Sequence, residues 1–136
     1  MIDNASLNDV IRSSRVVVRR GRYAYLKARA QTEFANHFLI ARDQDEITVI
    51  TEEAYLPQTS FEEHVKWFKL IEIRVSQPFV AKGFISRITQ AIAERELNVL
   101  VVSTFSKDYF LVREESIDTA VTALRDLGFP LLIEES

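Results

Sequence analysis

The chain has 136 residues, of which 47% are hydrophobic and 27% charged, and its formal net charge is −3. This length suits one domain or two very small ones, which fold without a metal or a disulfide, and the absence of cysteine excludes disulfides, thiol chemistry and cysteine-ligated metals. No apolar run approaches the roughly 20 residues of a membrane span, and no basic segment with an apolar core opens the chain, so we expect a cytoplasmic protein.

The first half of the chain predicts several strands and little helix. Leu7, Val10 and Ile11 form an apolar stripe at helical spacing. Runs of β-branched or alternating apolar residues then predict strands at 16–18, 23–30, 38–41 and 47–50. Residues 52–63 include a proline and several polar side chains, so we interpret them as a connector.

Five arginines lie within eleven residues of the first half. They are Arg12, Arg15, Arg19, Arg20 and Arg22. The cluster indicates either an anion-binding patch or a short strand with solvated ends. No aromatic residue interleaves with these arginines, which favours the strand over a surface for nucleic acid.

An acidic loop joins the strands predicted at 38–41 and 47–50. It contains Asp43, Asp45 and Glu46, which suggests a cation site. The loop lacks the spacing and the glycine of a calcium loop, so we interpret it as a solvated turn.

The second half predicts six elements in the order strand, helix, strand, strand, helix, strand. The first strand covers 66–75, and Ile85, Ile88 and Ile92 share a face of a helix at 82–96. Strands at 99–102 and 109–112 flank a polar turn, a helix covers 116–127, and a short strand ends at 133. This order defines the ferredoxin-like βαββαβ arrangement, an antiparallel sheet with both helices on one face. We therefore predict an α+β fold in which 65–136 form a complete unit and 1–64 a reduced one, either separate or merged into one compact domain.

Catalytic motifs are poorly represented. His37 and His64 lie far apart without a neighbouring metal-ligand residue, and neither GxSxG nor a phosphate-binding GxxxxGK[ST] is present. The strand at 99–102 is aliphatic and lacks the basic and aromatic pattern of an RNA-recognition strand. We therefore predict no enzyme, no cofactor, no metal and no nucleic-acid partner.

The helix start at residues 78–83 and the polar turn between the strands at 99–102 and 109–112 together suit a ligand with one positive and one negative group. Residues 78–83 place backbone N–H groups at a helix N-terminus, where a carboxylate binds well, and Gly83 lies at the helix entrance. Asp108 in the hairpin turn would bind an ammonium group, with a hydroxyl from Thr104 and an apolar wall from Phe105. The alternative is that Asp108 is a turn residue that satisfies its own backbone and that Phe105 is part of the core.

The chain resembles the ACT-domain proteins, in particular the paired-ACT family of bacterial standalone proteins and the ACT halves of cytosolic arginine sensors. The resemblance rests on residues 45–50, 66–68, 114–115 and above all on the segment STFSKDYFLV at 103–112. It implies ferredoxin-like units that hold an amino acid, with ligand-side positions at Gly83, Thr104, Phe105 and Asp108. Lys107 departs from the sensors, which have an aromatic residue there, and this disfavours a basic ligand.

By this resemblance we expect a regulatory module that binds a free amino acid, does not catalyse a reaction and forms a homodimer. It would bind neither nucleic acid nor a membrane. The first alternative is a structural or interaction domain that kept the ACT fold and lost its ligand. The second is a small enzyme.

Overall fold

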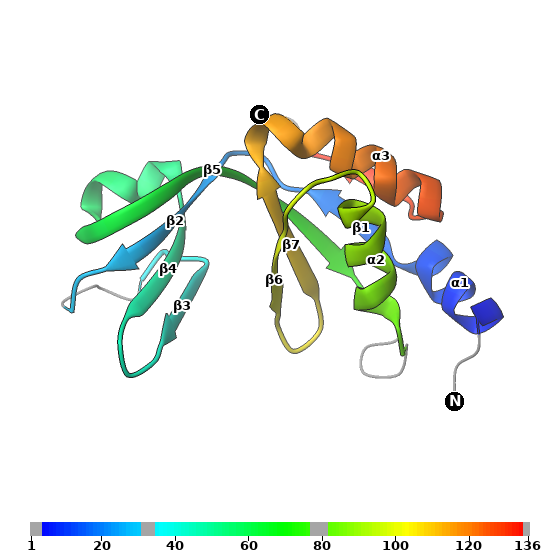
Figure 1. The fold of residues 1–136 in the computed structure, drawn as a ribbon, viewed down its shortest axis with the longest axis horizontal. Coiled ribbons are helices and arrows are strands. Elements are labelled where there is room, and N and C mark those ends of the chain that lie inside the picture. The colour runs from blue at the N-terminus through cyan, green and yellow to red at the C-terminus, as the bar shows by residue number, and fades with distance from the viewer. Residues whose placement is uncertain (1–3, 31–34, 77–81, 135–136) are drawn as a thin grey trace. The chain divides into compact units, whose positions relative to one another are not determined.

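The computed structural model describes residues 4–30, 35–76 and 82–134 (Figure 1). The elements follow one another as α1 (Asn4–Ser13), β1 (Arg15–Val18), β2 (Tyr23–Ala28), β3 (Leu39–Arg42), β4 (Ile47–Glu52), η1 (Glu53–Gln58), β5 (Phe61–Arg74), α2 (Phe84–Ala93), β6 (Leu100–Ser103), β7 (Asp108–Arg113), η2 (Glu114–Ser116), α3 (Ile117–Leu127) and β8 (Leu131–Ile133). The mixed α+β class predicted from the sequence is confirmed.

The chain divides into two compact units, and the sequence of one interrupts the sequence of the other. The terminal unit comprises Met1–Arg20 and Lys69–Ser136, and the inserted unit comprises Gly21–Phe68. The expected division between residues 64 and 65 differs from this one mainly at the N-terminus. Residues 1–20 belong with the C-terminal half, because β1 pairs with both β5 and β8.

The terminal unit contains the predicted order β5, α2, β6, β7, α3, β8. Its sheet has the order β6-β7-β5-β1-β8, with the C-terminal part of β5 at the centre. The sheet differs from the predicted antiparallel arrangement at one edge, where β8 pairs in parallel with β1. The reason is that β1 lies antiparallel to β5 and occupies the edge of β5 that would otherwise be open to β8.

All three α-helices of the terminal unit contribute to one hydrophobic core on one face of this sheet. Its buried residues include Leu7, Val10, Ile11, Val16, Ile71, Ile73, Phe84, Ile88, Ile92, Phe110, Val112, Ala120, Leu124 and Phe129. The predicted placement of α2 and α3 on one face is therefore confirmed. The predicted stripe of α2 is wrong at Ile85, which is exposed, because Phe84 precedes Ile88 by one full turn and takes the inward position.

The inserted unit is a sheet of the order β3-β4-β2-β5, using the N-terminal part of β5. Its core consists of Ala24, Leu26, Ala28, Ile47 and Val49. In the described part of this unit, η1 is the one helical element, and Leu56 from η1 packs against the core. The connector predicted at 52–63 is partly wrong, because β5 already begins at Phe61 and pairs there with β2.

Candidate functional site

The β6–β7 hairpin presents three of the four predicted site residues on one turn. The strands pair from Leu100 opposite Leu111 to Ser103 opposite Asp108. The backbone N–H of Thr104 donates to the carbonyl of Lys107 at 2.9 Å, and the Thr104 hydroxyl donates to the same carbonyl at 3.3 Å. The turn is therefore closed by Thr104.

The Asp108 carboxylate is oriented by a side chain that the sequence reasoning missed. The Ser103 hydroxyl donates to Asp108 Oδ1 at 2.7 Å, while Asp108 Oδ2 accepts no hydrogen bond from the part of the chain that the structure describes. The signal was available, since Ser103 and Asp108 flank a four-residue turn and such positions face each other in a hairpin. One carboxylate oxygen is thus held in place and the other is available.

Phe105 lies at the tip of this turn and is 87% exposed. The alternative in which Phe105 belongs to the core is therefore wrong. The exposed ring is thus an apolar surface on the short turn that precedes Asp108.

Gly83 lies at the N-terminus of α2 in the left-handed region, with φ of 81°. A Cβ atom there would meet only Leu7 Cδ2, at 3.8 Å, so the backbone conformation and not a lack of space favours glycine. Among the described residues no side chain caps this helix end. The first-turn N–H groups of an α-helix have no partner within the helix and favour an anion.

The topology brings Gly83 and the hairpin turn to the same end of the terminal unit. Strands β5 and β6 are joined through α2, so α2 begins at the end of the sheet where β6 turns into β7, as Figure 1 shows. The backbone amides at the start of α2 and the carboxylate of Asp108 are thus two groups of opposite polarity at one end of one domain. The rest of the predicted segment 78–83 lies largely outside the described residues.

The histidines and the acidic loop have structural roles. His37 Nδ1 lies 2.9 Å from the hydroxyl of Thr51, and the ring of His64 contacts Phe61 edge-on. Asp43 Oδ1 accepts the backbone N–H groups of residues 45 and 46, as a turn residue does. Within the described ranges no three His, Cys, Asp or Glu residues are grouped to hold a metal ion.

A depression of about 260 Å³ lies on the inserted unit. Its lining includes Tyr25, Lys27, Glu63 and Val65. None of the four predicted site residues belongs to it, so this depression and the predicted amino-acid site are separate features.

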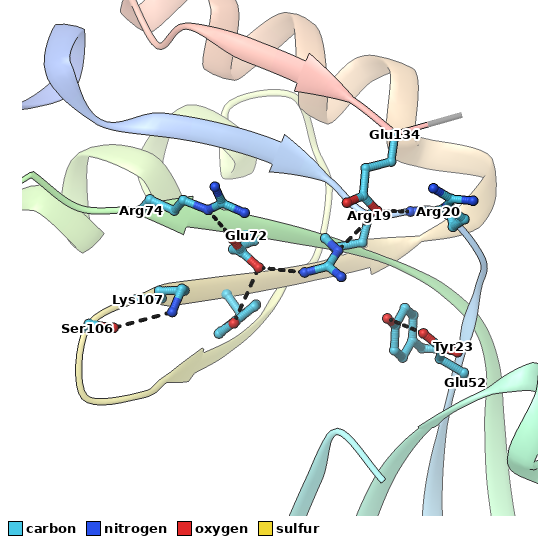
Figure 2. A network of polar contacts seen from close by, with 10 residues as sticks. Arg19, Arg20, Tyr23, Glu52, Glu72, Arg74, Ser106, Lys107 and Glu134 are labelled. Atoms are coloured by element: carbon cyan, nitrogen blue, oxygen red, sulfur yellow. Dashed lines mark hydrogen bonds and ion pairs between the residues drawn. The ribbon is translucent and has the colours of Figure 1, made fainter. Parts of the chain in front are cut away.

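A second polar cluster, also missed by the sequence reasoning, surrounds Glu72 on the other face of the terminal sheet (Figure 2). The Glu72 side chain is 2% exposed and accepts hydrogen bonds from Arg74 Nε at 2.5 Å and Arg19 Nη1 at 2.9 Å. The hydroxyl of Tyr109 lies 3.4 Å away, and Arg19 Nε also contacts Glu134 at 3.1 Å. The signal was the alternation in β5, where Glu72 and Arg74 alternate with Ile71 and Ile73.

The contacts within this cluster shift the pKa values of its ionisable side chains. Burial alone would raise the pKa of Glu72, but the hydrogen bonds from Arg74 and Arg19 outweigh it and lower that pKa. Burial, followed by the charge of Glu72, raises the pKa of Tyr109. The backbone N–H of Arg20 and the guanidinium of Arg19 lower the pKa of Glu134, against the opposing effect of burial. Glu72 and Glu134 are therefore anionic and Tyr109 is neutral at pH 7.

Comparison with known proteins assigns a family to the part of the chain that contains most of the terminal unit. Residues 64–126 match the family model of the ACT domain. These residues therefore form an ACT domain, and the predicted resemblance to ACT-domain proteins is confirmed. The narrower resemblance to paired-ACT proteins and arginine sensors stays a prediction. No curated protein sequence matches the chain.

Three solved structures illustrate the likeness of the fold. A protein from Agrobacterium tumefaciens has 19% identity and a TM-score of 0.75, with 90% of this chain and 95% of that chain covered. A protein of unknown function from Vibrio cholerae has 19% identity and a TM-score of 0.74, with 90% and 96% covered. The regulatory subunit of aspartate kinase from Thermus thermophilus has 10% identity and a TM-score of 0.60, with 82% and 96% covered. At these identities the likeness concerns the fold alone.

None of the helices in the described ranges combines the length and the apolar character needed to cross a bilayer.

Proposed function

We propose that this protein is a regulatory module that binds a free amino acid and does not catalyse a reaction. The observation that carries the proposal is the position of the oriented Asp108 carboxylate and the start of α2 at the same end of an ACT domain. A free amino acid needs one anionic and one cationic anchor, and these two groups supply both kinds. A regulatory role is supported by the likeness of the fold to the regulatory subunit of aspartate kinase from Thermus thermophilus.

In this proposal each of the four residues has a separate role. Asp108 binds the ligand ammonium through Oδ2, because Oδ1 is held by Ser103. The Thr104 hydroxyl gives its proton to the Lys107 carbonyl, so its oxygen accepts a hydrogen bond from the ammonium group. The conformation of Gly83 opens the start of α2 to the ligand carboxylate, and Phe105 packs against an apolar ligand side chain.

Lys107 narrows the class of amino acid. Its ammonium group lies 3.4 Å from the hydroxyl of Ser106, within the same turn as Phe105. The positive charge of Lys107 beside the site repels a ligand that has a basic side chain. The proposed ligand is therefore a neutral or acidic amino acid, and not arginine or lysine.

A thermal-shift screen with each of the 20 free amino acids tests the proposal. A ligand at 100 times its Kd stabilises the folded state by about 2.7 kcal/mol, which is readily measured as a rise in Tm. We expect one or a few chemically related neutral or acidic amino acids to raise Tm, and their D-enantiomers to have no effect. If no amino acid raises Tm at 10 mM or so, the ligand-binding proposal is wrong.

The second candidate is an interaction domain without a ligand. It is favoured by the exposure of large apolar side chains, with Phe105 at the hairpin tip and Leu132 and Ile133 on the edge strand β8. Exposed apolar residues on an edge strand are a common basis for association between chains. In this candidate the module forms a homodimer or contacts another protein, and the Asp108 region is only a turn.

A further inference from the structure

We propose a second binding site on this protein, separate from the amino-acid site, in which Arg15 and Arg74 together hold one oxyanion. The bound group is a carboxylate or a phosphate. The site lies on the face of the terminal sheet opposite the helices, at the end where β1 begins and β5 ends. It gives a function to Arg15, which belongs to the arginine cluster at residues 12–22.

The strand register places the two arginines side by side. Arg15 on β1 lies directly opposite Arg74 on β5, two positions away from the pair formed by Val17 and Glu72. The neighbouring pair of Val16 and Ile73 belongs to the core beneath the helices. Because side chains alternate along a strand, Arg15 and Arg74 both lie on the other face, the one that carries Glu72.

Two like charges in direct opposition destabilise an antiparallel pair unless a counter-charge lies between them. Glu72 does not supply that counter-charge to both, because its Oε2 binds Arg74 and its Oε1 binds Arg19. The side chain of Arg15 has no ion pair with any residue that the structure describes. The pair of guanidinium groups therefore lacks one anion.

Arg74 is held ready for a ligand by the buried carboxylate. Only its Nε is used by Glu72, so both terminal nitrogens remain available, and the side chain is 47% exposed. Figure 2 shows the terminal nitrogens of Arg74 directed away from Glu72. A guanidinium fixed by one hydrogen bond loses less entropy when it binds an oxyanion, and two guanidinium groups match the geometry of a carboxylate or phosphate.

The local charge balance agrees with an anionic ligand. Arg15 and Arg74 lie at this end of the sheet face, whereas Arg19, Arg20 and Glu134 lie near the other end of β1. The carboxylate that binds Arg74 is that of Glu72, which also binds Arg19, so the two arginines do not have one carboxylate each, on a chain whose formal net charge is −3. A positive region on an acidic protein attracts anions selectively to that region.

Titration calorimetry with inorganic phosphate and, separately, with malonate tests this inference. The measurements use the full chain at low ionic strength, and include Arg15→Gln as well as Arg42→Gln, a matched loss of one exposed positive charge on β3. We expect wild type and Arg42→Gln to bind at least one of the two anions, and Arg15→Gln to bind it about tenfold or more weakly. Binding of phosphate alone would identify a phosphorylated ligand, and binding of both a site for oxyanions in general.

Stability measurements provide an independent readout. Without an anion, Arg15→Gln should have an equal or slightly higher Tm than wild type, because the repulsion with Arg74 is removed. Phosphate should then raise the Tm of wild type and not of Arg15→Gln. Equal anion affinity in wild type and Arg15→Gln, or no binding of either anion by wild type, would overturn the inference. Asp108→Asn should bind phosphate with the affinity of wild type. The proposal of an oxyanion site and the proposal of an amino-acid site can therefore be refuted independently of each other.

Discussion

Ser103 and Asp108 face each other across the end of the β6–β7 hairpin, and the Ser103 hydroxyl donates to the Asp108 carboxylate at 2.7 Å. The pair fixes a negative charge at the rim of the ACT domain. A carboxylate that merely satisfied its own turn would accept backbone N–H groups, as Asp43 does in the inserted unit. Asp108 instead is oriented by a neighbouring side chain and keeps one oxygen open.

Removal of this orienting hydrogen bond should weaken ligand binding more than it weakens the fold. Ser103→Ala leaves the turn closed by Thr104 and removes one hydrogen bond to an exposed carboxylate, at a cost in binding of about 0.5–1.5 kcal/mol. We expect a change in Tm of less than 1–2 °C or so. Calorimetry with the amino acid found by the screen measures the affinity, and Ser106→Ala is the matched control. A loss of Tm without a loss of affinity would contradict the role given to Ser103.

Substitutions at Gly83 separate backbone strain from crowding of the site. Because φ is 81° and a Cβ meets nothing closer than 3.8 Å, Gly83→Asn should cost little stability, while Gly83→Val should cost about 1–2 kcal/mol. Both add a side chain beside the proposed carboxylate position, so both should weaken amino-acid binding. Urea unfolding and calorimetry on the two variants measure the two effects. Full affinity in Gly83→Asn would remove Gly83 from the site.

The Glu72 cluster should make stability depend on pH in acid. The hydrogen bonds from Arg74 and Arg19 lower the pKa of Glu72 in the folded state, despite its burial. The stabilisation by ionised Glu72 is fully present above the pKa of this side chain in the unfolded chain, about 4.3. It is lost as the pH falls through the lower pKa of Glu72 in the folded protein.

Glu72→Gln should therefore be less stable than wild type at pH 7, by about 1–3 kcal/mol. The difference should shrink as the pH falls below about 4. Urea unfolding at pH 7 and pH 3 measures it, and Glu62→Gln, which removes an exposed carboxylate 3.7 Å from Lys27, should change stability by less than about 0.5 kcal/mol. Parallel pH profiles for wild type and Glu72→Gln would show that the ion pairs add no stability.

Exposed apolar residues predict association between chains. Light scattering at high concentration should give a mass above the 15.7 kDa of a single chain. If the hairpin tip contributes, Phe105→Ser should shift the mass toward the monomer, because the 87% exposed ring would otherwise be buried between chains. A monomer at every concentration tested would refute the expected homodimer.

The sequence predicted the elements of the ACT domain better than their partners. The run of strand, helix, strand, strand, helix, strand follows from local apolar periodicity, and the position of Gly83 at the start of α2 follows from its backbone freedom. The pairing of β1 with β5 and β8 depends on contacts between residues more than 50 positions apart, which no local pattern encodes. The two units of the structure differ from the expected division between residues 64 and 65 for the same reason.

The site residues also divide into those that local sequence brings together and those that only the tertiary structure brings together. Asp108, Thr104 and Phe105 share one short turn, so spacing alone brings them together. The cluster of Arg19, Glu72, Arg74 and Glu134 combines three strands or their ends, and only the tertiary structure assembles it. The exposure of Phe105 also required the structure, because an aromatic residue in an apolar segment is more often buried.

The most direct test of the amino-acid-binding proposal is titration calorimetry of the amino acid found by the screen against wild type and Asp108→Asn. Asparagine keeps the shape and the turn preference of aspartate but removes the charge that would bind the ammonium group. We expect Asp108→Asn to retain the Tm of the unliganded wild type and to lose about 1.5–3 kcal/mol of binding free energy, a roughly ten- to hundredfold weaker affinity. Unchanged affinity in Asp108→Asn would show that the hairpin is only structural and that the ligand binds elsewhere.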